Sequence, residues 1–97
     1  MIVRIVKMHF RPDAVQEFLD IFERSCEQIR AFPGCEHLEL WQDHYDRGIF
    51  FTHSRWQTLE QLNEYRDSEL FAFVWPRTKA LFAAKPEAWS TELKKEL

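Results

Sequence analysis

The chain has 97 residues, which is enough for one domain but near the low end of what can build its own core. Its formal net charge of −3 and its interspersed charges of both signs argue against nucleic-acid binding, which needs a basic surface. No apolar run approaches the ~18 residues of a membrane span, and the first residues lack a small-residue cleavage site. We therefore expect one cytoplasmic domain over residues 1–97, with neither nucleic acid nor a membrane as its partner.

Residues 2–10 are predicted to form the first strand, because apolar side chains occupy much of both faces. A helix then begins near Asp13, where Asp13 and Gln16 fit a capping box. Pro33 and Gly34 end it. Its apolar residues recur at helical spacing and form one stripe: Val15, Phe18, Leu19, Phe22, Cys26 and Ile29.

Alternation predicts two further strands, over residues 35–43 and 49–56, joined by a loop at 44–48. Thr58 and Gln61 form a second capping box, which opens a short helix.

Ser68 is predicted to cap a longer helix, and Pro76 within it should kink or interrupt that helix because proline removes one amide donor. The inward side of this helix is expected to hold Phe71, Val74, Trp75, Thr78, Leu81 and Phe82. Residues 87–93 alternate again and form the last strand.

The resulting order, β-α-β-β-α-β, predicts an α+β fold of the ferredoxin-like, split-βαβ kind. Its helices would cover one face of a four-stranded antiparallel sheet. The opposite face would expose Ile49, Phe51 and their neighbours, a patch large enough to indicate an interface. We therefore expect a homodimer, in which two bare sheet faces pack together as a dimeric α/β barrel.

Four features carry a family resemblance: the Pro-Gly-Cys turn at 33–35, a strand that ends in Trp56, Thr58 as a cap, and the segment YRDSELF at 65–71. With these features the chain resembles the antibiotic biosynthesis monooxygenase (ABM) family over nearly its whole length. The resemblance implies a dimeric α/β barrel with a pocket between sheet and helices in each subunit. Members of that family include cofactor-free monooxygenases that oxidise phenolic polycyclic substrates with O2, haem-degrading monooxygenases and isomerases.

The resemblance also suggests roles for single residues. Trp56 matches the pocket tryptophan at the end of the third strand. Thr52 and Ser54 occupy the strand face on which quinone-forming members place an asparagine. Trp75 stands where haem-degrading members carry an axial histidine, and residues 2–7 lack the asparagine that those members need on the first strand. The chain is therefore expected to use no cofactor and no metal.

An aromatic pocket is the first candidate site. A flat substrate could stack on aromatic side chains there, beside two hydroxyls on the same face of the third strand. The alternative is that the same rings simply fill the core between helix and sheet. The candidate substrate-binding residues are Trp56, Thr52, Ser54, Tyr65, Phe71 and Trp75.

His53 is the candidate acid or base, because an imidazole titrates near neutrality. Its position in the strand is opposite in parity to Trp56, which directs it toward the expected dimer face. If residue 39 pairs with residue 53, Glu39 becomes its cross-strand neighbour, and a structural hydrogen bond is then the commoner role. His37 and His53 could also bind a metal, but the sequence shows no third ligand at a fixed spacing.

Two functions remain open from the sequence. The first is an ABM-like, cofactor-independent monooxygenase or isomerase that acts on a small aromatic or oxygenated metabolite, with His53 or a bound water handling protons. The second is a non-catalytic dimeric module that binds a small hydrophobic ligand. The sequence leaves open whether the chain is an oxidoreductase at all.

Overall fold

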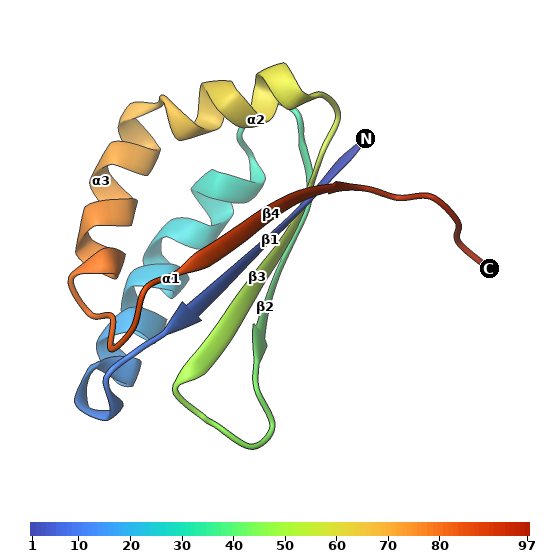
Figure 1. Cartoon of the computed structure of the whole chain (residues 1–97). Helices are drawn as coiled ribbons and strands as arrows, with labels where there is room; N and C mark the ends of the chain where they lie inside the picture. The colour runs from blue at the N-terminus through green and yellow to red at the C-terminus, as the bar shows by residue number, and fades with distance from the viewer.

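A four-stranded antiparallel sheet carries three helices on one of its faces and leaves the other face bare (Figure 1). The computed structural model describes all residues from 1 to 97. In chain order the elements are β1 (Ile2–His9), the short 3-10 turn η1 (Pro12–Ala14), α1 (Val15–Arg30), β2 (Cys35–Gln42), β3 (Ile49–Trp56), α2 (Leu59–Arg66), α3 (Glu69–Lys79) and β4 (Glu87–Glu92).

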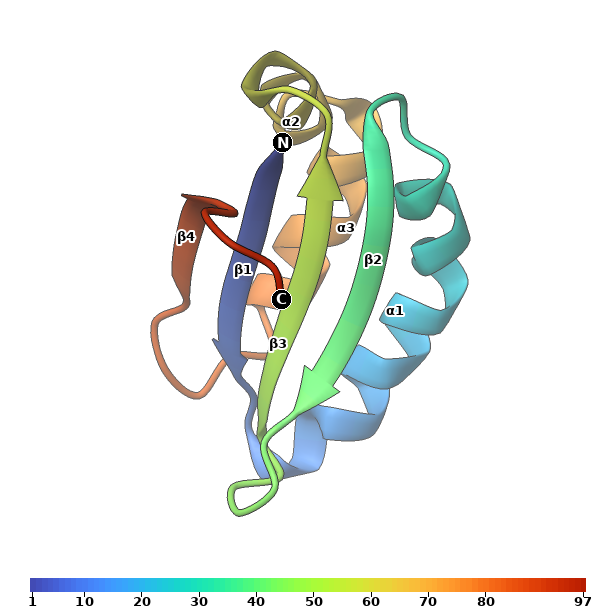
Figure 2. The same ribbon diagram turned by 90° about the vertical axis from the view of Figure 1, so that its right-hand side faces the viewer.

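The strand order is β2-β3-β1-β4, so the first and third strands of the chain lie at the centre and β2 and β4 at the edges. This is the ferredoxin-like arrangement that the element order predicts. In Figure 2 the bare face is toward the viewer, with α1 and α3 behind the sheet. The predicted α+β fold is therefore confirmed. None of the helices has the length and apolar character needed to span a membrane.

The hairpin register of β2 and β3 decides which side chains share a face. Glu39 pairs with His53, and Trp41 pairs with Phe51, with an irregularity in the ladder between Cys35 and His37. The pairing of residue 39 with residue 53 is thus confirmed. Because successive side chains of a strand point to opposite faces, His53 and Ser54 lie on different sides of the sheet.

Two of the three predicted helix caps are confirmed. The amide of Gln61 donates to the Thr58 hydroxyl at 3.1 Å, and the amide of Phe71 donates to the Ser68 hydroxyl at 3.2 Å. The capping box at Asp13 is wrong, because the chain enters α1 through the 3-10 turn and no side chain caps either element. The Asp13 carboxylate instead lies 3.5 Å from the Nε of Arg11.

Pro76 does not interrupt the last helix, since α3 continues through it to Lys79. The amide of Ala80 still donates to the Pro76 carbonyl at 3.1 Å, so the helix resumes its bonding one turn later. The Thr78 hydroxyl donates to the Val74 carbonyl at 3.0 Å, which adds a bond in the same turn. Of the two expected effects, the interruption is therefore wrong, because the proline costs the helix a single amide donor, and the kink stays a prediction.

Gly34 is required by the turn that follows α1. Its φ of +91° lies in the region that side-chain-bearing residues rarely adopt, and a Cβ there would come within 2.6 Å of the Gln61 side chain. The Gly34 carbonyl also accepts from the amide of Gln57 at 2.9 Å. This turn thus holds the end of β3 and the start of α2 in place, which positions one end of the pocket described below.

The core lies between the sheet and the helices, in two clusters. The first packs η1, α1 and the segment after α3 on the centre of the sheet, with Trp75 of α3 against it, and consists of Met8, Phe10, Ala14, Phe18, Phe50 and Leu81. The second, near α2, holds Cys35, Trp56 and Leu62. The predicted inward side of α3 agrees with this arrangement, because Thr78 and Leu81 are buried and Phe71, Val74, Trp75 and Phe82 are half-buried.

Candidate functional site

A pocket of about 310 Å³ lies between the helix-covered face of the sheet and the helices. Its floor comes from the side chains of β1, β2 and β3 that point toward the helices, and its walls come from all three helices and the start of β4. Thirteen of its twenty lining residues are hydrophobic, so the space favours an apolar ligand over an ion.

An unbroken series of aromatic contacts forms one wall of this pocket. Trp56 stacks on Tyr65 with ring centroids 5.1 Å apart, and Tyr65 meets Phe71 edge to face at 5.3 Å. Phe71 in turn stacks on Trp75 at 5.7 Å. These distances are those of favourable aromatic pairs, so the rings hold one another in position.

Few polar groups line the pocket, and two of them are the hydroxyls of Ser54 on β3 and Tyr65 on α2. The indole Nε1 of Trp56 donates to the Ser54 hydroxyl oxygen at 3.0 Å, which leaves the hydroxyl hydrogen of Ser54 without a protein acceptor. Burial raises the pKa of Tyr65 to about 12, and the neighbouring Cys35 adds a smaller contribution. Tyr65 therefore stays neutral at physiological pH and keeps a hydroxyl hydrogen that it can donate.

Two arginines line the pocket among these apolar groups. Arg4 of β1 lies on the helix-covered side, and Arg66 ends α2. Burial lowers the pKa of the Arg4 guanidinium, and the positive charge of Arg66 lowers it further. Neither arginine forms an ion pair, and Arg4 donates only to the Ser90 hydroxyl at 2.9 Å. The pocket thus combines an aromatic wall with two arginines that form no ion pair, while the one carboxylate that lines it, Glu87, lies 3.9 Å from Lys7.

All six residues that the sequence singled out as substrate-binding line this one pocket. Trp56 also belongs to the core, since it is 1% exposed. The same ring can therefore both fill the core and line the pocket. The sequence reasoning missed Arg4 and Arg66. Arg4 alternates with Val6 and Met8 on the pocket side of β1, and that parity was the signal that could have found it.

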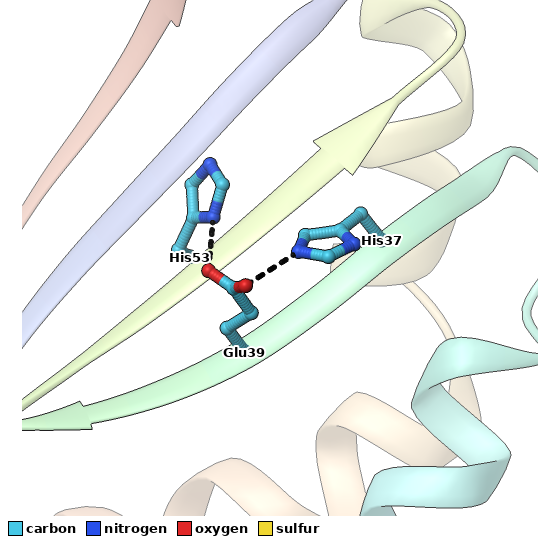
Figure 3. Close-up of side chains that lie close together, drawn as sticks. All are labelled: His37, Glu39 and His53. Carbon is cyan, nitrogen blue, oxygen red and sulfur yellow. Dashed lines mark hydrogen bonds and ion pairs between the residues drawn. The ribbon is translucent and has the colours of Figure 1, made fainter.

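His53, the candidate acid or base, lies on the bare face of the sheet and is not among the residues that line the pocket. It is 8% exposed, and its Nδ1 lies 3.0 Å from Glu39 Oε1. The other oxygen of Glu39 lies 3.0 Å from His37 Nε2, so one carboxylate joins two imidazoles (Figure 3). His53 therefore cannot exchange a proton directly with a molecule in the pocket.

This group, which we call the His-Glu-His cluster (His37, Glu39 and His53), is held by its surroundings. Trp41 stacks on the His53 ring at 5.1 Å and donates from Nε1 to Glu39 Oε1 at 3.1 Å. The hydrogen bond with His53, then those with His37 and Trp41, lower the pKa of Glu39 to about 2. The carboxylate is thus ionised at physiological pH and has donors around both oxygens.

The three donor atoms of the cluster lie within 4.8 Å of one another. The sequence offers His37 and His53 as ligands but shows no third at a fixed spacing. The third is Glu39, which the strand pairing brings opposite His53 although the two residues are fourteen positions apart. Only the register reveals it, because the spacing alone does not place residues 39 and 53 together.

Comparison with solved structures gives the same fold throughout. A crystal structure of an antibiotic biosynthesis monooxygenase is 21% identical, with a TM-score of 0.92, and the match covers 98% of this chain and 100% of that one. A conserved protein from Methanosarcina mazei Go1 is also 21% identical, with a TM-score of 0.90 over 97% and 94% of the two chains. A protein from Mycobacterium tuberculosis is 20% identical, with a TM-score of 0.89 over 98% and 96%.

These identities are low, so the structures establish the shared fold and not a shared reaction. No curated protein matches the chain. The family profile described as antibiotic biosynthesis monooxygenase matches residues 1–73, which include the first three strands, α1, α2 and the start of α3. The chain belongs to the antibiotic biosynthesis monooxygenase family.

Proposed function

We propose that the chain is a cofactor-independent monooxygenase that oxidises a small phenolic aromatic molecule in the pocket between sheet and helices. The observation that carries the proposal is the combination of an aromatic wall with Arg4, a half-buried cation that has no carboxylate partner. A flat, electron-rich ring that can become an anion is the ligand that matches both features.

The aromatic wall supplies binding and orientation. A planar substrate can stack on a ring of this wall, in which Phe71 and Trp75 already stack on each other within 18° of parallel. A volume of about 310 Å³ suits a molecule of two or three fused rings.

The polar groups supply the charge that the reaction needs. The positive charges of Arg4 and Arg66 lower the pKa of a phenol bound near them, because an opposite charge favours the ionised form. The free hydroxyl hydrogens of Ser54 and Tyr65 can donate to the phenolate oxygen. Since His53 lies outside the pocket, water at the pocket mouth is the proton acceptor in this proposal.

The phenolate form makes direct reduction of O2 possible. The electron-rich ring reduces O2, and a ring C–H becomes C=O in the product quinone. One oxygen atom enters the product, and the other leaves as water with the ring hydrogen and the phenol hydrogen. The substrate gives up the four electrons that O2 takes, so no further reductant is needed. A pocket that excludes most water protects the intermediates.

We further propose that the working form is a homodimer that buries the bare face of the sheet. Large apolar side chains remain exposed or half-exposed there, among them Trp41 at 43% and Trp89 at 44%. Ile5 and Phe51 lie between them in the sheet, so the apolar surface runs from one edge to the other. A surface of that extent on a small domain indicates an interface.

The experiment that tests the enzymatic proposal follows oxygen and substrate together. We expect the protein to consume O2 in proportion to quinone formed when it meets a panel of hydroxylated naphthalenes and anthracenes, and to form no quinone under argon. Trp56→Phe should lower turnover, and Arg4→Gln should raise KM and shift the optimum to higher pH. Tyr45→Phe, in the exposed hairpin loop and outside the pocket, is the matched control and should keep wild-type turnover.

A different result would replace the proposal. Substrate loss under argon would indicate an isomerase, and tight binding without any turnover would indicate the second candidate, a module that only binds a hydrophobic ligand. The observation that favours this second candidate is that no histidine lines the pocket, so the side chain best suited to proton transfer near neutrality is missing there.

A further inference from the structure

We propose that the His-Glu-His cluster on the bare face of the sheet is a binding site for a borderline divalent cation of the zinc type. The site is independent of the pocket, because its ligands point to the other side of the sheet. It rests on three donor atoms that the strand register brings together, and these are drawn in Figure 3.

The distances match what such an ion needs. Four ligands at about 2.1 Å around a tetrahedral ion lie about 3.4 Å from one another. In the cluster, Glu39 oxygens lie 3.0 Å from His53 Nδ1 and 3.0 Å from His37 Nε2, and all donor atoms fall within 4.8 Å. To surround a tetrahedral ion, ligand atoms that lie up to 4.8 Å apart must approach one another to about 3.4 Å, a movement that rotation of the three side chains can supply.

The chemistry of the donors selects the ion. Two imidazole nitrogens and one carboxylate oxygen form the set that zinc takes with a water as its fourth ligand, and that Fe(II), Co(II) and Ni(II) also accept. Magnesium and calcium prefer all-oxygen surroundings, so they fit this set poorly. Glu39 bonds to no lysine or arginine, so an ion competes for its oxygens only with the contacts from His37, His53 and Trp41.

The ligands are held on rigid backbone. His37 and Glu39 are alternate residues of β2 and share its bare face, and Glu39 is paired directly with His53 of β3. Trp41 fixes two of the ligands at once, since its ring stacks on His53 and its Nε1 donates to Glu39 Oε1 at 3.1 Å. Outer partners of this kind orient metal ligands and are part of most metal sites.

A bound ion would join β2, an edge strand, to its neighbour β3 through side chains in addition to the ladder. His53 is 8% exposed and the side chains of His37 and Glu39 are 41% and 45% exposed, so the open coordination positions face away from the sheet. If a second copy covers this face, the ion lies in the interface and water or the partner completes its coordination. All three protein ligands come from one chain, so the site forms in either state.

The test uses the full chain with any purification tag removed and metals stripped by a chelator. Titration with zinc chloride, followed by calorimetry and by elemental analysis after dialysis, should show one zinc per chain. His37→Gln and Glu39→Gln should each weaken zinc binding by about a hundredfold or more. Trp41→Phe, which keeps the stacked ring and loses the donor, should weaken it by about tenfold. His44→Gln, in the exposed hairpin loop, is the matched control and should bind as the wild type does.

A second readout is the absorption spectrum of a bound metal, which reports the geometry of its coordination. Cobalt(II) in place of zinc should give visible absorption bands of a four-coordinate site, and these bands should be absent in Glu39→Gln. Circular dichroism checks that each variant is folded; His37 and Glu39 are chosen over the nearly buried His53 for this reason. The proposal is overturned if zinc does not bind stoichiometrically, if binding survives in both His37→Gln and Glu39→Gln, or if His44→Gln removes it.

Discussion

The two faces of the sheet differ in what they present, although the same four strands build both. The helix-covered face combines aromatic rings with the cations Arg4 and Arg66 around a pocket. The bare face combines exposed tryptophans with a carboxylate held between two imidazoles. Neighbouring residues such as His53 and Ser54 therefore serve different sites, and the alternation of the strand, more than nearness in sequence, decides which chemistry each can join.

We expect the largest effect on stability from removing the ring of Trp56, which is packed against the helix-covered face of the sheet. Trp56→Ala should lower the free energy of unfolding by about 3–5 kcal/mol, because Trp56 is 1% exposed and its loss leaves a cavity among packed rings. Urea denaturation followed by circular dichroism measures this at a fixed protein concentration. Tyr45→Ala, in the hairpin loop and 91% exposed, is the control and should change stability by about 0.5 kcal/mol or less. Equal effects of the two changes would contradict the packing described here.

The next prediction concerns the bare face and the proposed dimer. Phe51→Glu should weaken dimerisation by about a hundredfold, since it replaces a large apolar side chain by a charged one at the centre of the surface that the second copy covers. Light scattering coupled to size exclusion should then report the chain mass of 11.8 kDa, where the wild type gives twice that mass.

Phe73→Glu is the matched control for this dimer prediction. Phe73 is 59% exposed on α3, which lies on the opposite side of the sheet. The same change there should leave the mass of the particle unaltered. A wild-type protein that runs as a monomer at micromolar concentration would remove the proposed interface altogether.

Much of this comparison could be predicted from the sequence. Alternation in residues 49–56 assigned Trp56 and His53 to opposite faces, and the β-α-β-β-α-β order gave the one-sided covering of the sheet. Both results follow from patterns that are local to one element. The pocket residues were accessible for the same reason, because Tyr65, Phe71 and Trp75 fall on the inward sides of their helices.

The rest depends on contacts between elements that no local pattern encodes. Glu39 becomes the third member of the His-Glu-His cluster only through the register of β2 on β3. The cap expected at Asp13 fails because a 3-10 turn precedes α1, and the geometry of that turn leaves no position for the carboxylate to cap. The break expected at Pro76 fails because packing and the neighbouring bonds of α3 outweigh the loss of one donor.

A smaller effect should appear in the dependence of stability on alkaline pH. Burial raises the pKa of Tyr65 to about 12, above the value of about 10 for an unfolded tyrosine. Between pH 10 and pH 12 the unfolded chain loses this proton while the folded chain keeps it, so stability falls as pH rises. The slope reaches at most about 1.4 kcal/mol per pH unit.

Tyr65→Phe isolates this pH effect because the variant has no proton to lose at this position. Denaturation at a series of pH values should show a shallower fall between pH 10 and 12 for the variant than for the wild type. Absorbance at the tyrosinate wavelength gives a second measurement, in which the step near pH 12 should be missing from the variant. A Tyr65 that ionises near pH 10 in the folded protein would mean that the helix-covered face is open to water there.

The smallest expected effect compares the caps that hold the helices on that face. Thr58→Ala should lower the free energy of unfolding by about 1 kcal/mol, because the hydroxyl of Thr58 accepts from the amide of Gln61 at the start of α2. Asp13→Ala is the matched comparison, because it removes another residue that the sequence predicts to cap a helix. It should change stability by only a few tenths of a kcal/mol, since Asp13 caps nothing and pairs with Arg11 at the surface. Because α2 carries Leu62 and Tyr65 into the pocket region, loosening its first turn should also weaken binding of an aromatic ligand, whereas Asp13→Ala should leave that binding unchanged. A larger loss of stability from Asp13→Ala than from Thr58→Ala would show that the entry to α1 is capped in solution.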